Sequence, residues 1–277
     1  MPLRVAAIGT RIAPVTWTAT TRTALAYAAA LDAGDERLLR DDAADFTALP
    51  MQIVTPEWAA ALALRDADTL GLAPAEAIRG VHAGQDTRFL LPLPRDRALR
   101  TEAEIIGVRA VRSGALMTVR YMTYDADTLV AETLSHSVYR GVATDADAIQ
   151  DQPADNHDRV ACTQTAAIRL PRGFAHLYSE CAAIWNPIHT ERRVALAAGL
   201  PDIIVHGTAL WALAGLTLMR GAPSRRLTRL ACRFASPLIA GEDVALHHGA
   251  DDHRAAFDMR NAAGVACVTA GIAEFAE

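Results

Sequence analysis

One six-residue pattern occurs twice in this chain of 277 residues. Residues 88–93 read R-F-L-L-P-L and residues 233–238 read R-F-A-S-P-L, so the pattern R-F-x-x-P-L returns after 145 residues. A pattern that returns in matching surroundings indicates a duplicated structural unit. The chain is therefore predicted to contain two copies of one fold.

The segments after the two copies have the same character. Three alternating segments follow each copy, at residues 103–112, 115–124 and 129–139 and at residues 244–248, 254–260 and 265–275. Apolar and polar residues that alternate with a period of two, between turn residues, indicate antiparallel strands. Each copy is therefore predicted to end in an antiparallel meander.

Helical sequence precedes each meander. The predicted helices cover residues 22–31 and 56–64 in the first half and residues 174–183 and 208–219 in the second. Thr20 or Thr21 can cap the first of these helices, and Pro56 can start the second. Each unit thus places its helices before its strands.

The offset between equivalent helices is nearly constant. Tyr27 and Tyr178 lie 151 residues apart, and so do Pro56 and Gly207. A long apolar helix wrapped by a twisted antiparallel sheet is the hot-dog arrangement. Two such units in tandem would pair their sheets and bury the strands at the join. The predicted fold class is α+β, a tandem or double hot-dog.

An acidic segment separates the two units. Residues 144–158 contain five aspartates, one proline and few apolar residues, which is typical of a solvated linker. The predicted division is an N-terminal half at residues 1–143, this linker, and a C-terminal half at residues 159–277.

Composition narrows the classes of partner. The net charge of -5 does not favour nucleic acid, which would prefer a basic face. No run approaches 18 apolar residues, and the first residues contain no long apolar core of a signal peptide, so no membrane partner is expected. The four cysteines form no C-x-x-C pair, which predicts free thiols in a reducing cytoplasm.

The second half contains the most informative motif. Residues 178–189 read Y-S-E-C-A-A-I-W-N-P-I-H, and the segment V-H-G ends at Gly207. In this order the two segments resemble the hydratase 2 motif of MaoC-like (R)-specific enoyl-CoA hydratases. Residues 233–243 are similar to the sheet motif of the same family. The resemblance extends over both halves, but only the second half has N-P-x-H.

This resemblance implies a hydro-lyase that adds water to, or removes it from, an enoyl-CoA-type thioester. His189 would be the acid/base residue, since histidine titrates near neutrality. The backbone N–H of Gly207 would stabilise the thioester oxygen as it gains negative charge. Asn186 would position water or substrate. CoA is then part of the substrate, and neither a cofactor nor a metal is expected.

The chain departs from the family at one position. The catalytic aspartate of the family lies five residues before the histidine, where this chain has Ile184. Glu180, one helical turn away, and Asp202, shortly before His206, are candidate substitutes; the alternative for Glu180 is a carboxylate on a helix surface. A single acid/base group contributes about 10²–10⁴-fold. Its loss could leave a slow hydratase, a changed reaction or a binding protein.

Other residues near the motif are candidates for contact with substrate. These predicted substrate-binding residues are Tyr178, Ile184, Trp185, Asp202 and His206. Tyr178 is interpreted as a core or pocket-wall residue, Trp185 as lining the pocket or packing under it, and the ring of His206 could instead only pack. Arginines that could hold CoA phosphates, if they are not merely solvated or paired, are Arg192, Arg193, Arg225, Arg226 and Arg229.

The first half is predicted to be catalytically silent. It has no N-P-x-H, and Pro56, which has no N–H, matches Gly207. Among relatives such a half makes room for bulky acyl groups. The expected partner is an acyl-CoA or acyl-carrier thioester, with a homodimer or a complex with another hot-dog chain through the sheet edges. A non-catalytic acyl-CoA-binding subunit and a hot-dog thioesterase remain alternatives.

Overall fold

The computed structural model describes residues 1–65, 70–146, 148–149 and 160–277. The first half contains η1 (Val5–Ala7), β1 (Val15–Thr18), α1 (Thr21–Ala30), α2 (Glu36–Leu39), η2 (Pro50–Ile53), α3 (Val54–Arg65), α4 (Pro74–Ala77), β2 (Gly80–Phe89), β3 (Ala98–Val111), β4 (Gly114–Asp125), β5 (Thr128–Arg140) and β6 (Ala148–Ile149). The second half contains β7 (Gln164–Ile168), α5 (Phe174–Ala182), η4 (Pro187–His189), α6 (Arg192–Ala197), α7 (Gly207–Gly221), β8 (Arg226–Phe234), β9 (Val244–Ala250), β10 (Arg254–Asn261) and β11 (Ala266–Ala276).

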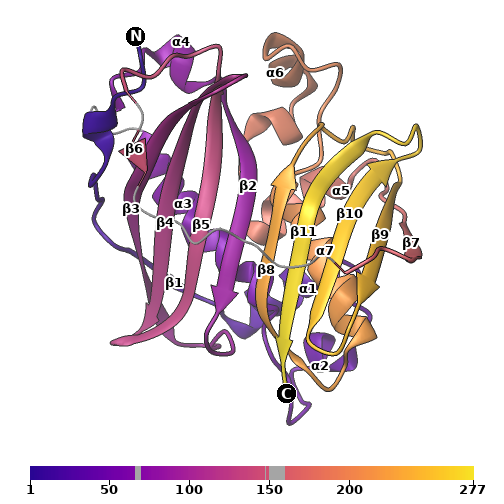
Figure 1. Ribbon diagram of the computed structural model, residues 1–277. Coiled ribbons are helices and arrows are strands. Elements are labelled where there is room, and N and C mark those ends of the chain that lie inside the picture. Colours follow the sequence, from indigo (N-terminus) through magenta and orange to yellow (C-terminus); the bar gives the residue numbers. More distant parts are fainter. Residues whose placement is uncertain (66–69, 147, 150–159) are drawn as a thin grey trace.

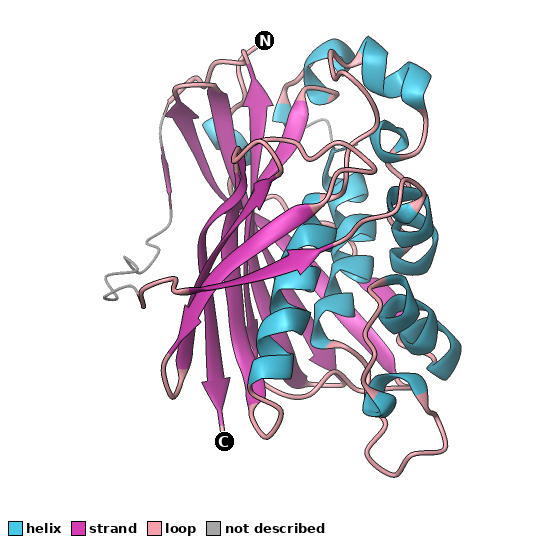
Figure 2. Ribbon diagram, turned by 90° about the vertical axis from the view of Figure 1, so that its right-hand side faces the viewer, coloured by secondary structure: helices cyan, strands magenta, loops and turns pink. Residues whose placement is uncertain are grey.

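The eleven strands in the described ranges belong to one sheet. Its order is β1-β3-β4-β5-β2-β8-β11-β10-β9-β7, with β6 paired to β3 (Figure 1). The long helices pack against one face of this sheet (Figure 2). The predicted α+β double hot-dog is therefore confirmed. None of the helices in the described ranges is long and apolar enough to cross a membrane.

The two halves join where β2 pairs with β8. The pairing is antiparallel and runs from Gly84 opposite Arg233 to Arg88 opposite Arg229. Each copy of R-F-x-x-P-L begins at the end of one of these strands. Because the strands are antiparallel, the two copies lie at opposite ends of the sheet.

All four predicted helices agree with α1, α3, α5 and α7 to within two residues at each end. α3 starts at Val54, two residues before its predicted start, and follows directly on the 3-10 turn η2. Pro56 lies in the first turn of α3, where a missing N–H breaks no helical hydrogen bond. The helical segment of the first half therefore begins with η2 at Pro50, and neither Pro50 nor Pro56 has the backbone N–H that Gly207 has.

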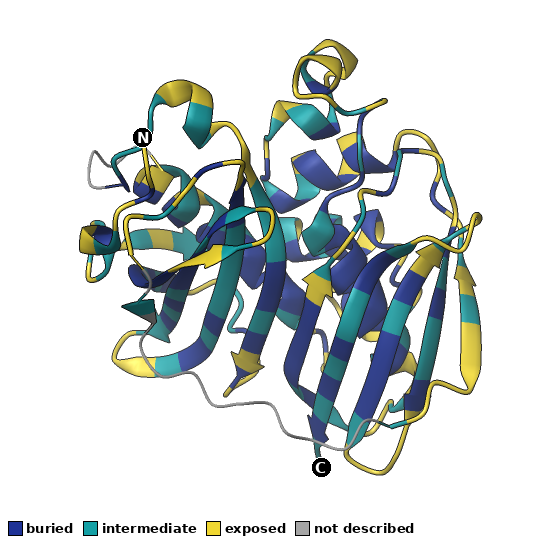
Figure 3. Ribbon diagram, turned by 45° about the horizontal axis from the view of Figure 1, so that its top comes forward, coloured by how far each residue is buried: buried dark blue, intermediate teal, exposed yellow. Residues whose placement is uncertain are grey.

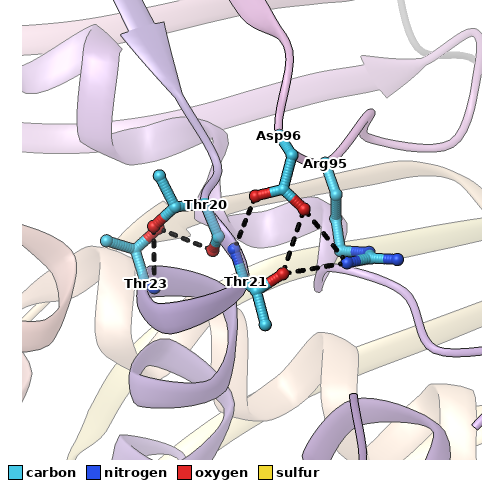
Figure 4. A network of polar contacts seen from close by, with 5 residues as sticks. All are labelled: Thr20, Thr21, Thr23, Arg95 and Asp96. Carbon is cyan, nitrogen blue, oxygen red and sulfur yellow. Dashed lines mark hydrogen bonds and ion pairs between the residues drawn. The ribbon is translucent and has the colours of Figure 1, made fainter. Parts of the chain in front are cut away.

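The start of α1 is fixed by two caps, shown in Figure 4. Thr20, one of the two predicted caps, accepts a hydrogen bond from the backbone N–H of Thr23 at 3.2 Å. Asp96 accepts from the backbone N–H of Thr21 at 2.9 Å and from its hydroxyl at 3.0 Å. Arg95 donates to the same hydroxyl at 3.1 Å. These contacts hold α1 against the turn that follows the first R-F-x-x-P-L copy.

The core differs between the halves, although both bury their long helix against the sheet (Figure 3). In the second half α7 is apolar on nearly all sides, and its Trp211 is fully buried and donates to the carbonyl of Leu230 at 3.1 Å. In the first half α3 buries Glu57, which accepts a hydrogen bond from Gln85 of β2 at 2.9 Å. A buried carboxyl therefore stands in the core of the first half.

The predicted linker lies largely outside the described residues. Of its described part, Thr144 forms a bridge with Leu3, and β6 pairs with β3, so these residues belong to the first half of the sheet. The boundaries of the two halves remain a prediction.

Candidate active site

The site begins at the end of α5, where the chain reverses. Ala183 follows the helix with φ 53° and ψ 39°, the left-handed conformation that disfavours residues with a Cβ atom. The turn lets the backbone N–H of Ile184 donate to the carbonyl of Ser179 at 3.0 Å. The N-P-I-H segment therefore leaves α5 in a fixed direction.

The N-P-I-H segment then forms the short turn η4. Asn186 caps this turn by accepting a hydrogen bond from the backbone N–H of Ile188 at 3.5 Å, and Pro187 occupies its first position. Pro187 loses nothing there, because the first N–H of a helical turn has no partner within the turn. His189, the last residue of η4, is held 8% exposed.

The protonation of His189 follows from its partner. Nδ1 lies 2.8 Å from the carbonyl oxygen of Ile204, which can only accept, so the ring carries its proton on Nδ1. Nε2 then has a lone pair, and no residue in the described ranges donates to it. Burial lowers the pKa of His189 to about 4, so the ring is neutral at pH 7. His189 thus presents one basic nitrogen.

His206 lies directly under this ring. The two imidazoles stack with their centroids 3.7 Å apart and an angle of 24° between them. Nε2 of His206 lies 3.1 Å from the hydroxyl of Ser179 and 3.4 Å from the carbonyl of Ile184. Burial, and then the neighbouring His189, hold the pKa of His206 well below its ordinary value. Its Nδ1 is buried without a hydrogen-bond partner in the described part of the chain.

Gly207 begins α7 immediately after His206. Within the described residues, no group accepts a hydrogen bond from the backbone N–H of Gly207, as expected for the first residue of a helix. A Cβ atom at this position would lie 3.1 Å from the ring of Phe234, so glycine is needed for close packing. Phe234 belongs to the second R-F-x-x-P-L copy. The ring of His82, from the first half, packs against it with the two ring centroids 4.8 Å apart.

Tyr178 connects the site to the other half. Its hydroxyl donates to Thr208 at 3.2 Å and lies 3.3 Å from the hydroxyl of Tyr27, which donates to the carbonyl of Met51 at 3.1 Å. Burial raises the pKa of Tyr178 to about 12, so the phenol stays neutral. The two equivalent tyrosines therefore meet where the halves join and support the starts of both long helices.

Ser179 is the site residue that sequence reasoning missed. The buried positions of α5 include Ala175, Tyr178, Ser179 and Ala182, which share one helical face. The helical period could have placed Ser179 on the inner face beside Tyr178. Glu180, the next residue, is exposed.

The candidate carboxylates do not contact His189. Glu180 is exposed on α5, and among the described residues no hydrogen bond or ion pair joins it to His189 or His206. Asp202 accepts hydrogen bonds from the backbone N–H of Ile203 at 2.8 Å and from Arg172 at 3.3 Å, and Arg192 pairs with it at 3.4 Å. The backbone N–H of Ile203, more than the two arginines, lowers the pKa of Asp202. Both carboxylates therefore lie outside the immediate surroundings of His189.

The remaining candidates occupy different environments. Ile184 is buried, and its carbonyl oxygen faces His206. Trp185 is 61% exposed and lies on the surface beside Asn186. Arg229 pairs with Asp86 and with Glu274 in the middle of the sheet. Among the described residues no group of three or more histidines, cysteines or carboxylates could hold a metal ion.

The first half repeats the geometry of this turn with other side chains. Asp32 follows α1 with φ 50°, as Ala183 follows α5, and lies 151 residues before it. Asp35 caps α2 by accepting from the backbone N–H of Arg37 at 3.0 Å, as Asn186 caps η4. With the same offset, Leu38 takes the position of His189. The first half therefore keeps the turn without the histidine.

Comparison with known proteins agrees with this description. The family model "MaoC like domain" matches residues 156–270. Peroxisomal multifunctional enzyme type 2 of Mus musculus is 22% identical over 247 residues, which cover 82% of this chain and 31% of that protein. The chain thus spans about a third of the length of this curated relative.

Two solved structures show the same fold over nearly the whole chain. The MaoC-like dehydratase from Phytophthora capsici has a TM-score of 0.81 at 20% identity, and the match covers 98% of this chain and 96% of that one. A Mycobacterium tuberculosis protein described as having a double hotdog fold has a TM-score of 0.59 at 14% identity, covering 97% and 95%. The protein is thus a double hot-dog. Its second half matches the family model of the MaoC like domain, which confirms the resemblance found in the sequence.

Proposed function

We propose that this protein adds water to, or removes it from, an enoyl-CoA-type acyl thioester, with His189 as the acid/base residue. The observation that carries the proposal is the lone pair of His189 Nε2 beside the start of α7, where the N–H of Gly207 has no acceptor among the described residues. A base and an oxyanion donor are the two groups that such a reaction needs.

In the hydration direction, Nε2 of His189 takes a proton from water as the water oxygen bonds to C3 of the enoyl group. The electrons of the C2–C3 double bond shift toward the thioester, whose oxygen becomes negative. The N–H of Gly207 donates to that oxygen, assisted by the positive end of α7. His189 then returns the proton to C2, so one histidine serves as base and as acid. Dehydration is the reverse.

Other residues of the site hold the imidazoles of His189 and His206 in place. The carbonyl of Ile204 holds the tautomer of His189, and Asn186 fixes the turn that delivers it. We further propose that Asn186, which is half-buried beside the exposed Trp185, orients water or substrate. The contact between Ser179 and His206 holds the second imidazole under the first.

A pH dependence follows from the neutral state of His189. Hydration requires Nε2 to be unprotonated, and the pKa of this ring is about 4. We expect kcat/KM for hydration to stay level from about pH 6 to 9 and to fall as the pH approaches 4. A rate that rises toward low pH would show that His189 must start protonated.

A second candidate is a non-catalytic acyl-CoA-binding subunit. Ile184 stands where the family has its aspartate, and neither Glu180 nor Asp202 contacts His189. The two functions differ in turnover, since a binding subunit would hold CoA esters without converting them.

The test is hydration of crotonyl-CoA and of longer and branched enoyl-CoAs, followed at the enoyl-thioester absorbance band. Wild type and His189→Ala are compared, and circular dichroism verifies the fold of the variant. We expect a clear wild-type rate and a loss of about 10²–10⁴-fold in the variant. Binding of CoA esters by both proteins with turnover by neither would favour the second candidate.

A further inference from the structure

A cavity of about 230 Å³ lies at the far end of α7 from His189. Its apolar walls include Leu38, Phe89, Leu93, Leu216 and Met219. Gly207 and Met219 are twelve residues apart on one helix, which corresponds to about 18 Å along its axis. The cavity is therefore separate from the candidate active site.

The cavity occupies the place in the first half that the active site occupies in the second. Leu38, in the position of His189, forms part of its wall, and so does Pro50, which starts the helix as Gly207 does. The first R-F-x-x-P-L copy contributes Phe89 and Leu93. The acid/base group and the free N–H are thus both missing, while a hollow remains.

Charged residues surround this apolar hollow. The cavity is lined by one carboxylate, Asp35, and by four guanidinium groups, those of Arg37, Arg220, Arg225 and Arg226. The lining residues therefore carry a charge of +3, in a chain whose formal net charge is -5.

Three of these four arginines differ in how far a nearby group neutralises their charge. Arg37 is paired with Asp35 at 2.7 Å. Arg226 donates to the carbonyl of Phe89 at 2.8 Å, and a carbonyl leaves its charge in place. Within the described part of the chain, the acidic partner of Arg225 is the highly exposed Asp252 at 3.8 Å, a pair that water and salt screen. Arg225 and Arg226, adjacent in sequence, therefore keep most of their positive charge at the cavity.

We propose that this cavity binds the anion of a medium-chain fatty acid, with the chain against the apolar walls and the carboxylate at Arg225 and Arg226. A guanidinium group can hold a carboxylate through two parallel hydrogen bonds. The volume equals that of about eight water molecules at about 30 Å³ each, and a methylene group is of similar size. An eight-carbon chain is therefore the matching probe.

The test is calorimetric titration of the full chain with octanoate. We expect saturable binding that weakens about tenfold or more in the double variant Arg225→Glu/Arg226→Glu, since a charge-assisted contact is replaced by repulsion. The matched control is Arg192→Glu/Arg193→Glu, an equal charge reversal on α6 at the active-site end. The control should bind octanoate within twofold of wild type.

A second variant tests the cavity without changing charge. Leu91 lines the cavity and is 42% exposed, so Leu91→Trp can fill the space from its rim with little disturbance of the core. This variant should also bind octanoate about tenfold more weakly, and 1-octanol, which has no charge, should bind wild type more weakly than octanoate does.

Several outcomes would overturn the proposal. They are absence of octanoate binding to wild type, unchanged binding in both cavity variants, and weakened binding in the α6 control. His189→Ala should keep full octanoate affinity. The result is thus independent of whether the proposed hydration is observed, and loss of octanoate binding in His189→Ala would place the ligand in the active site instead.

Discussion

The turn after α5 and the turn after α1 share a backbone path but differ in chemistry. Ala183 and Asp32 both adopt the left-handed conformation, and Asn186 and Asp35 cap the next turn through the same pair of backbone positions. His189 ends the one turn, and an aliphatic residue occupies its position in the other. The cap and the left-handed residue therefore determine the path, whereas the side chain that ends the turn and the free N–H of Gly207 distinguish the candidate active site from its silent counterpart.

In the cores, unlike in the turns, it is the first half that has the additional polar group. Leu230 of β8 packs under α7, while Gln85, at the equivalent position 145 residues earlier, meets the buried Glu57 of α3. Burial raises the pKa of Glu57 to about 7. The first half thus carries a costly polar group in its core, and the second half concentrates its polar groups where chemistry is proposed.

Apart from substitutions of His189, the largest effect is expected when the second half is made to resemble the first at the start of its long helix. Gly207→Pro removes the proposed oxyanion donor but suits the first position of a helix, and His206 already has the extended conformation that precedes proline. We expect kcat for enoyl-CoA hydration to fall by about 10²–10³-fold.

The control for this variant is Gly207→Ala. It brings the same Cβ atom toward Phe234, at 3.1 Å, but keeps the N–H. The difference in kcat between the two variants isolates the hydrogen bond. Equal rates in both would show that the N–H has no part in the reaction.

A substitution in the first half should change stability with pH. The pKa of Glu57 is raised from 4.5 in the unfolded chain to about 7, so the folded state binds more protons between these values. The protonated carboxyl of Glu57 contributes its whole stabilisation below pH 4.5, and this stabilisation is lost as the pH rises through 7. Glutamine does not titrate, so Glu57→Gln does not lose this stability. The free energy of unfolding of the variant minus that of wild type should therefore increase by about 3 kcal/mol from pH 4 to pH 8.

Urea unfolding of both proteins across this range checks the prediction. His82 and His189, whose pKa values are lowered to about 4, give both proteins an opposite trend, a loss of stability as the pH falls below 6.5. These trends cancel in the difference between variant and wild type. A difference that does not vary with pH would show that folding does not raise the pKa of Glu57.

The smallest effect is expected at the left-handed residues. Ala183→Gly removes the strain of a Cβ atom at φ 53° and should stabilise the protein by about 1 kcal/mol. Asp32→Gly should gain less, because aspartate tolerates this conformation better than alanine does. Chemical denaturation of the two variants measures the contrast. Destabilisation by Ala183→Gly would mean that the alanine methyl contributes packing that outweighs its strain.

Much of the fold could be predicted from the sequence because its signals are local. The segments that alternate with a period of two correctly predicted β3, β4, β5, β9, β10 and β11. The repeated motif indicated two equivalent units. The predicted start at Pro56 lies two residues inside α3, and six residues after the start of the 3-10 turn η2 at Pro50. A 3-10 turn before a helix leaves only a weak pattern, and a proline at a helix start resembles a proline two residues inside it.

The site was less accessible to sequence reasoning because its contacts are long-range. The motif identified His189, Asn186 and Gly207, but the stacking of His189 on His206 depends on how η4 lies against the start of α7. Glu180 was chosen for its chemical type and its distance along the helix. A choice by helical face would have preferred Ser179.

The central claim is that His189 performs the chemistry, and its most direct test compares the two equivalent turns. kcat/KM for enoyl-CoA hydration is measured for His189→Leu, which gives the second turn the side chain of the first, and for Leu38→Ala, a substitution at the equivalent position of the silent half. We predict a loss of about 10²–10⁴-fold in His189→Leu, with the fold retained, and a change of less than about threefold in Leu38→Ala. Wild-type activity in a folded His189→Leu, or an equal loss in both variants, would contradict the account.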